Sequence, residues 1–171
     1  MNKIARPTSR VKLRSVANKI RELIKIPEDE PFPVVQFLEV ILSEWNYEMH
    51  IVPDEDMDNN YAETIPSLKI CRIRESVYEN AIKGSPRDRF TIAHEIGHIF
   101  LHDDLTVSFA RNEKNIPAYK DPEWQASTFA AELLVPYSQI KGMTVEEISK
   151  KYIVSKKVAQ IQASYISKIP A

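Results

Sequence analysis

The sequence predicts an α+β protein that is mostly helical and carries a small mixed or antiparallel sheet. Three observations support this fold class. Hydrophobic residues recur at helical spacing through most of the chain. Two short segments, 47–52 and 68–74, alternate between hydrophobic and polar residues, as half-buried strands do. The length of 171 residues, with 43% hydrophobic and 27% charged residues, is typical of one globular domain.

Two amphipathic helices are predicted before the first strand. Segment 9–26 has helical periodicity and ends at Pro27, and segment 33–45 repeats the pattern. Residues 1–25 carry eight Lys or Arg against one Glu, whereas residues 26–68 carry eleven acidic residues and no Lys or Arg. We interpret this separation as the solvated faces of packed helices. The alternative is an acidic surface that attracts a basic macromolecule, such as a DNA-binding protein.

The middle of the chain contains shorter elements. An acidic loop over 54–60 follows the first strand and lacks the spacing and the glycine of a calcium loop. After the second strand, a short helix over 75–83 ends at Gly84. The next helix begins at Pro86 or Asp88.

That next helix contains the motif His94-Glu95-x-x-His98. Four residues advance a helix by ~6 Å and slightly more than one turn, so the two imidazoles share a face. The residues around the motif are hydrophobic on every side, which predicts a buried helix. Polar side chains are costly there unless they have a partner, and we predict that the partner is Zn²⁺. The alternative is a hydrogen-bonded pair of core histidines.

A catalytic zinc ion has three protein ligands and keeps its fourth position for water. His102 lies ~6 Å beyond His98 along the helix, so we expect it at the helix end or supporting a ligand histidine. The zinc motif with a third histidine needs glycine at position 101 and histidine at position 104. Leu101 and Asp104 stand there, which excludes that class of site.

The third ligand is therefore expected to be a downstream carboxylate, and Glu113, Glu123 and Glu132 are the candidates. Asp121-Pro122-Glu123 is a strong helix start, and the helix that it opens runs to Val135. Positions 123, 127, 130 and 134 share a face, on which small residues permit close approach to the histidine helix.

Glu123 is the ligand that we favour on this basis. The other two candidates are less suitable, because Glu132 falls on a side of the helix predicted to be solvated and Glu113 lies in the irregular segment 103–120. The alternative role of Glu123 is to stabilise the helix dipole from the first turn.

Glu95 follows His94 directly and need not bind the ion. Its position suits a general base that takes a proton from water at the metal and passes it to a leaving amine, which is the chemistry of peptide-bond hydrolysis. The donor that stabilises the oxyanion remains open between Tyr119, Tyr137 and His102.

The C-terminal part of the chain predicts a helical pair. Thr144 and Glu147 form a capping box before a short helix, and a last helix spans 155–166. Direct DNA binding through this basic pair or through the first helix is a hypothesis that we rank last. The pair lacks an evident turn glycine and offers few side chains that would read bases.

Two motifs carry a family resemblance. The sequences RDRFTIAHEIGH (87–98) and EWQASxFAAELLVP (123–136) resemble the ImmA/IrrE family of bacterial zinc metallopeptidases. The resemblance is good over residues 68–136 and looser over 141–166. It implies zinc bound by His94, His98 and Glu123. It also implies a zincin-like, thermolysin-like core in which the strand before the histidine helix guides the substrate.

The resemblance also divides the chain and shows one departure. We expect N-terminal helices over 1–46, the metallopeptidase core over 47–140 and the C-terminal helical pair over 141–171. The family usually has Asn or Asp where this chain has Ser127. A weaker hydrogen bond to a zinc histidine is the expected consequence.

Members of this family typically cleave or control a helix-turn-helix repressor, often in mobile-element or stress-response circuits. The resemblance thus implies a zinc endopeptidase that relieves repression by hydrolysing a DNA-binding repressor. The alternative is a non-proteolytic zinc-fold module that sequesters the repressor. A cytoplasmic location is expected, because the sequence has no membrane-length hydrophobic run, no signal-peptide segment and a single cysteine, Cys71.

Overall fold

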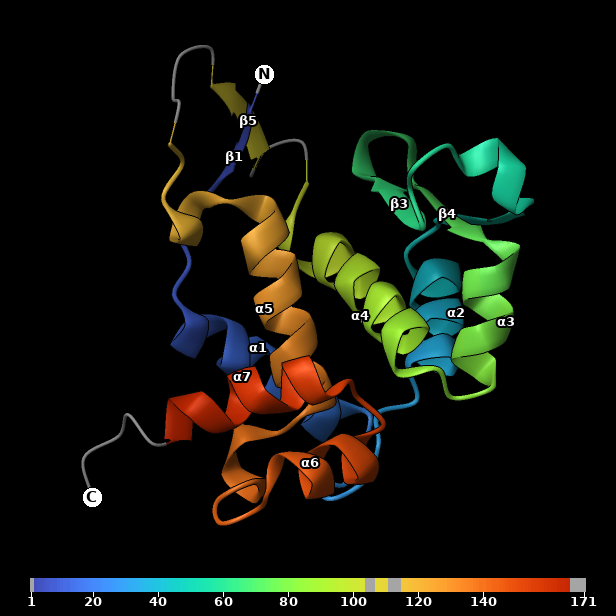
Figure 1. Cartoon of the computed structure of the whole chain (residues 1–171). Helices are drawn as coiled ribbons and strands as arrows, with labels where there is room; N and C mark the ends of the chain where they lie inside the picture. The colour runs from blue at the N-terminus through green and yellow to red at the C-terminus, as the bar shows by residue number, and fades with distance from the viewer. Residues whose placement is uncertain (1, 104–106, 111–114, 167–171) are drawn as a thin grey trace.

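Helix α4 (Pro86–Leu101) runs through the middle of the molecule, and the other elements pack around it (Figure 1). The computed structural model describes residues 2–103, 107–110 and 115–166. The other α-helices of these residues are α1 (Arg10–Leu23), α2 (Val34–Glu44), α3 (Glu75–Ile82), α5 (Pro122–Leu134), α6 (Val145–Tyr152) and α7 (Lys156–Ile166). The strands are β1 (Asn2–Ala5), β2 (Glu48–Val52), β3 (Ala62–Ile65), β4 (Ile70–Arg74) and β5 (Val107–Ala110).

The larger sheet has three strands in the order β2-β4-β3. Strand β2 is parallel to β4 and β3 is antiparallel to it, so the sheet is mixed and the predicted α+β class is confirmed. The central strand β4 buries Cys71 and Ile73 completely. Strand β3 was not predicted. It forms the edge of the sheet above α4, and its register places Thr64 opposite Cys71 (Figure 1).

A second, two-stranded sheet joins distant parts of the chain. Strands β1 and β5 pair antiparallel, with Ala5 opposite Val107. The segment that follows β1 continues along the start of the α5 region, because the Thr8 amide donates to the Tyr119 carbonyl at 2.9 Å. The N-terminal residues are thereby held beside α5.

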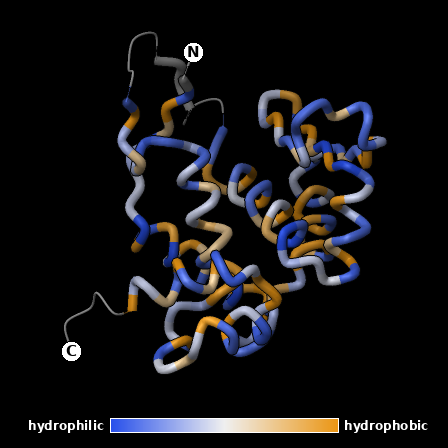
Figure 2. Tube along the Cα trace, viewed as in Figure 1, coloured by the Kyte–Doolittle hydropathy of each residue, from blue (hydrophilic) through white to orange (hydrophobic). Residues whose placement is uncertain are grey.

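Helix α4 buries most of its circumference, as its hydrophobic composition predicts. Helices α2 and α3 lie on one side of it and α5 on the other (Figure 1). Ile92 and Ile96 of α4 are fully buried, as are Phe129 and Leu133 of α5. In Figure 2 the outer helices change between hydrophobic and hydrophilic along their turns, the pattern of amphipathic helices around a shared core.

Helices α4 and α5 are in close contact at Gly97. A methyl group on this residue would lie 3.0 Å from the Cα of Ala126 and 3.1 Å from its carbonyl oxygen. The sequence predicted close approach from the small residues of α5. The structure locates the contact at position 126, one turn away from Glu123.

We expect Gly97→Ala to lower the free energy of unfolding by about 1–3 kcal/mol, because the new methyl group meets backbone atoms that cannot rotate away. Urea denaturation measures the effect. An unchanged free energy of unfolding would show that the helices do not depend on this close contact.

Helix α1 covers the face of α5 that carries Glu132. This side chain is fully buried, and its carboxylate lies 2.7 Å from the Nε of Arg10 and 2.8 Å from the Nε of Arg14. The prediction that Glu132 lies on a solvated face is therefore wrong. The periodicity of α5 alone does not reveal that a basic helix packs on that face.

Arg21, also from α1, is buried at the end of α5. Its guanidinium donates to the carbonyls of Leu133 at 2.8 Å and Leu134 at 3.4 Å. Further bonds reach Pro27 and Glu30. Burial lowers the pKa of Arg21 to about 10, so it stays charged at neutral pH and satisfies carbonyls that a helix end leaves without partners.

The C-terminal pair packs beneath α5. Thr144 and Glu147 form the predicted capping box of α6. The turn between α6 and α7 has Ile153 in the left-handed region at φ 53°, where glycine is the usual residue. On α7, the fully buried Gln162 donates to the carbonyls of Ala131 and Val135. Across the part of the chain that the structure describes, no helix combines the length and hydrophobicity needed to cross a membrane.

Candidate metal centre and cleft

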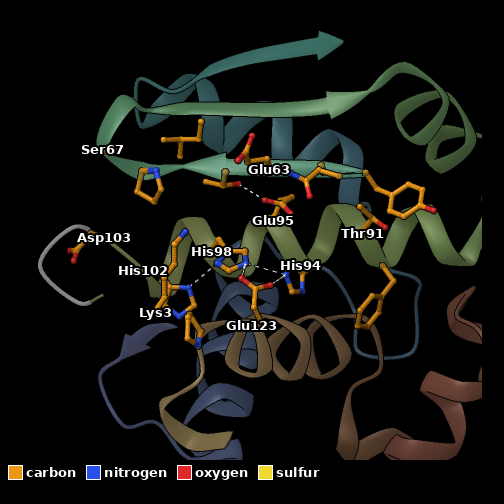
Figure 3. A pocket seen from close by; sticks show the side chains of 18 of the residues that line it. Lys3, Glu63, Ser67, Thr91, His94, Glu95, His98, His102, Asp103 and Glu123 are labelled. Carbon is orange, nitrogen blue, oxygen red and sulfur yellow. Dashed lines mark hydrogen bonds and ion pairs between the residues drawn. The ribbon is translucent and has the colours of Figure 1, made fainter. Parts of the chain in front are cut away.

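Three side chains from two helices converge beside α4. The Nε2 atoms of His94 and His98 are 3.0 Å apart. The Glu123 carboxylate reaches them from α5, at 3.1 Å from His94 and 3.5 Å from His98 (Figure 3). Two imidazole nitrogens and one carboxylate oxygen are a donor set that suits Zn²⁺ and leaves one position for water or substrate.

The local sequence explains this convergence. The spacing of His94 and His98 puts both rings on one face of α4, and Asp121 caps α5 so that Glu123 stands in its first turn. The two histidine side chains are 18% and 16% exposed and that of Glu123 is 65% exposed, so the cluster opens toward solvent. Hydrogen bonds with both imidazoles hold the pKa of the Glu123 carboxyl well below its usual range, so it is ionised at neutral pH.

Ser127 contacts the far side of the His94 ring, with 3.1 Å between its Oγ and Nδ1. A hydroxyl donates and accepts hydrogen bonds equally well. Ser127 thus fixes the orientation of the ring without fixing which nitrogen carries the hydrogen.

His102 lies at the C-terminal cap of α4 and is not in the cluster of possible ligands. Its Nδ1 is 2.9 Å from the Nδ1 of His98, and its Nε2 is 3.0 Å from the Oε1 of Gln125. Burial lowers the pKa of His102 to about 4, so the ring is neutral at physiological pH. Sequence reasoning placed His102 at the helix end but did not find Gln125.

Glu95 points from α4 toward the edge strand β3 and lines the same cleft as His94 and His98 (Figure 3). Its side chain is buried, and the Thr64 hydroxyl donates to its Oε2 at 2.6 Å. The Thr64 hydroxyl is also 3.8 Å from the sulfur of Cys71. Burial raises the pKa of the Cys71 thiol to about 12, so this cysteine is not a nucleophile at neutral pH. Thr64 was missed because β3 carries no clear alternation.

A cleft of about 1090 Å³ runs between β3 and α4 and includes the three candidate ligands and Glu95. Its described lining contains four carboxylates but one ammonium group, that of Lys3 on β1, which reaches toward His98 (Figure 3). The carboxylates belong to Glu63, Glu95, Asp103 and Glu123. The cleft therefore has an acidic character.

The remaining sequence candidates lie elsewhere. Glu113 is outside the described residues, and Glu132 is paired with α1 away from the histidines. Of the three possible oxyanion donors, His102 lines the cleft, whereas Tyr119 and Tyr137 are not among its described lining residues. The Tyr137 ring instead lies under the Arg14 guanidinium at 3.7 Å.

Comparison with known proteins supports a hydrolytic site. Residues 48–164 match the peptidase family described as the IrrE N-terminal-like domain. No curated protein and no solved structure matches the chain. The match includes the candidate ligands and all of the cleft lining except Lys3, but not β1, α1 and α2, which precede residue 48.

Proposed function

Because the chain belongs to the peptidase family described as the IrrE N-terminal-like domain, we propose that it is a zinc-dependent endopeptidase whose substrate is a helix-turn-helix repressor. The observation that carries this proposal is the convergence of His94, His98 and Glu123 in the cleft that also holds Glu95. This arrangement provides three ligands and a separate carboxylate for proton transfer.

The two sides of the cleft have different tasks in the proposed reaction. A bound Zn²⁺ would act as a Lewis acid that polarises the scissile carbonyl and lowers the pKa of a water molecule. Glu95 accepts the proton of the attacking water and delivers it to the leaving amine. The hydrogen bond from Thr64 holds the Glu95 carboxylate in one orientation for both transfers.

The edge of β3 supports binding of an extended peptide. Among the described strands, β3 pairs only with β4, along one of its edges, and the cleft lies beneath it (Figure 3). An extended substrate can add to such an edge through main-chain hydrogen bonds, which brings a peptide bond over α4. The acidic lining of the cleft favours a basic segment, as found in DNA-binding proteins.

Zinc content and proteolysis together test this function. We expect about one Zn²⁺ per chain, lost in Glu123→Gln, and cleavage of a helix-turn-helix protein encoded in the neighbouring reading frame. Mass spectrometry of the products identifies the bond. A chain that binds zinc and the repressor without cleaving it would overturn the endopeptidase proposal in favour of a sequestering module.

We expect Thr64→Val to lower kcat about tenfold, because it removes one hydrogen bond to a charged catalytic group while keeping the side-chain shape. Thr64→Ser keeps the hydroxyl and is expected to restore most of the rate. Kinetic assays at equal zinc content measure the effect. Equal kcat values for the valine and serine variants would show that this hydrogen bond does not position Glu95.

A further inference from the structure

Gln125 connects the candidate metal ligands, through His102, to the N-terminal segment. Its amide nitrogen donates at 2.8 Å to the Arg6 carbonyl and at 2.8 Å to the Tyr119 carbonyl. An amide group has two hydrogens, and both are used. The orientation of the amide is thereby fixed, and its oxygen faces the Nε2 of His102.

The fixed amide determines the positions of the ring hydrogens beyond it. Because the Gln125 oxygen only accepts, His102 must carry its hydrogen on Nε2, which leaves Nδ1 as an acceptor. The Nδ1 of His98 is 2.9 Å away and is therefore the donor. A neutral His98 with its hydrogen on Nδ1 has an unprotonated Nε2, the atom that faces His94 and Glu123.

We propose that Gln125 is a positioning residue of the metal site and that, through His102, it holds His98 in the tautomer that binds a metal. The Arg6 carbonyl is part of this relay, so the N-terminal segment before residue 48 helps to form the site. This inference rests on the metal centre of the proposed function but not on peptide hydrolysis.

The two ligand histidines differ in this respect. His94 has Ser127 as its partner, and a hydroxyl accommodates either tautomer. His98 is linked through His102 to the fixed amide of Gln125, and this chain of hydrogen bonds permits one tautomer of His98. The relay thus holds His98, but not His94, in the metal-binding tautomer before an ion binds.

The test replaces Gln125 with methionine. Methionine keeps the length of the side chain but lacks the amide oxygen that accepts from His102 and the amide nitrogen that donates to the two carbonyls. Replacing a residue that hydrogen-bonds to a ligand histidine typically lowers metal affinity by about 10- to 100-fold. We expect a loss of this size for Gln125→Met when zinc is titrated against a chelator at one pH. His102→Phe removes the acceptor of His98 and is expected to lose about as much.

The double variant Gln125→Met/His102→Phe distinguishes a relay from two separate effects. Because Gln125 acts only through His102, the double variant should bind zinc no more weakly than His102→Phe alone. Additive losses would overturn the relay.

Gln162→Met is the matched control. Gln162 is also buried, and its amide also donates to two backbone carbonyls, those of Ala131 and Val135. It does not contact the ligand histidines. We expect a comparable loss of stability and unchanged zinc affinity. Weaker zinc binding in this control, equal to that of Gln125→Met, would show that the affinity reports only general destabilisation.

Nitrogen-15 NMR of the metal-free chain reads the tautomers without any reaction. We expect hydrogen on Nδ1 of His98 and on Nε2 of His102 near neutral pH, and a mixture of tautomers in Gln125→Met. A wild-type His98 with its hydrogen on Nε2 would overturn the proposal. This measurement remains decisive even if the chain hydrolyses no peptide, so failure of the inference and failure of the proposed function are separate outcomes.

Discussion

Glu95→Gln is expected to reduce the rate of substrate cleavage by about 10²–10⁴-fold, the range that a general acid–base group contributes. Glutamine accepts the hydrogen bond of Thr64 and keeps the shape of the side chain, but it does not take a proton from water. Zinc content should remain near that of the wild type, because Glu95 is not in the ligand cluster. Single-turnover cleavage with metal analysis measures both quantities.

Glu79→Gln is a suitable control for this experiment. Glu79 lies on the exposed side of α3, where Lys83 is 3.8 Å away, and it is remote from the cleft lining. Its replacement should leave the rate unchanged. Cleavage by Glu95→Gln at the wild-type rate would reject the assignment of Glu95 as the base. Relief of repression by a Glu95→Gln chain that no longer cleaves would instead indicate sequestration.

Glu132→Ala is expected to lower the free energy of unfolding by about 3 kcal/mol, because breaking a buried ion pair from one side leaves uncompensated charge. The fully buried carboxylate serves both Arg10 and Arg14, whose side chains are 13% and 19% exposed. Their partial exposure places the effect at the lower end of the usual range for buried pairs. Urea denaturation with an unchanged m-value measures it.

Glu22→Ala provides the comparison for Glu132. Glu22 pairs with Lys19 at 3.0 Å on the outer face of α1, where the two side chains are 70% and 60% exposed. A pair in water contributes little, so this variant should change stability by less than about 0.5 kcal/mol. Equal effects of the two substitutions would show that α1 does not depend on the buried carboxylate for its attachment to α5.

The N-terminal residues support the site from outside the matched region. Arg10 and Arg14 attach α1 to α5, the helix that presents Glu123. The Arg6 carbonyl reaches Gln125 on the same helix. These contacts come from residues outside the matched region, and none of these residues is a candidate ligand.

Features that depend on local spacing can be predicted from the amino-acid sequence. The periodicity of α4 and α5, the caps at Asp121 and Thr144, and the pairing of His94 with His98 on one face follow from residues a few positions apart. Glu123 was also selected from the faces of one helix, and the structure places it beside both histidines. Helical geometry repeats every turn, so such relations can be read directly from the chain.

Contacts between segments that are distant in the sequence depend on the three-dimensional packing of the chain. Thr64 reaches Glu95 because β3 pairs with β4, and the short β3 has no periodicity that marks it as a strand. Glu132 is buried because α1 lies across α5, which no pattern within α5 indicates. Gln125 sits between His102 and the Arg6 carbonyl for the same reason. A single helix specifies which residues share a face, whereas the partner of that face is set by packing across the whole chain.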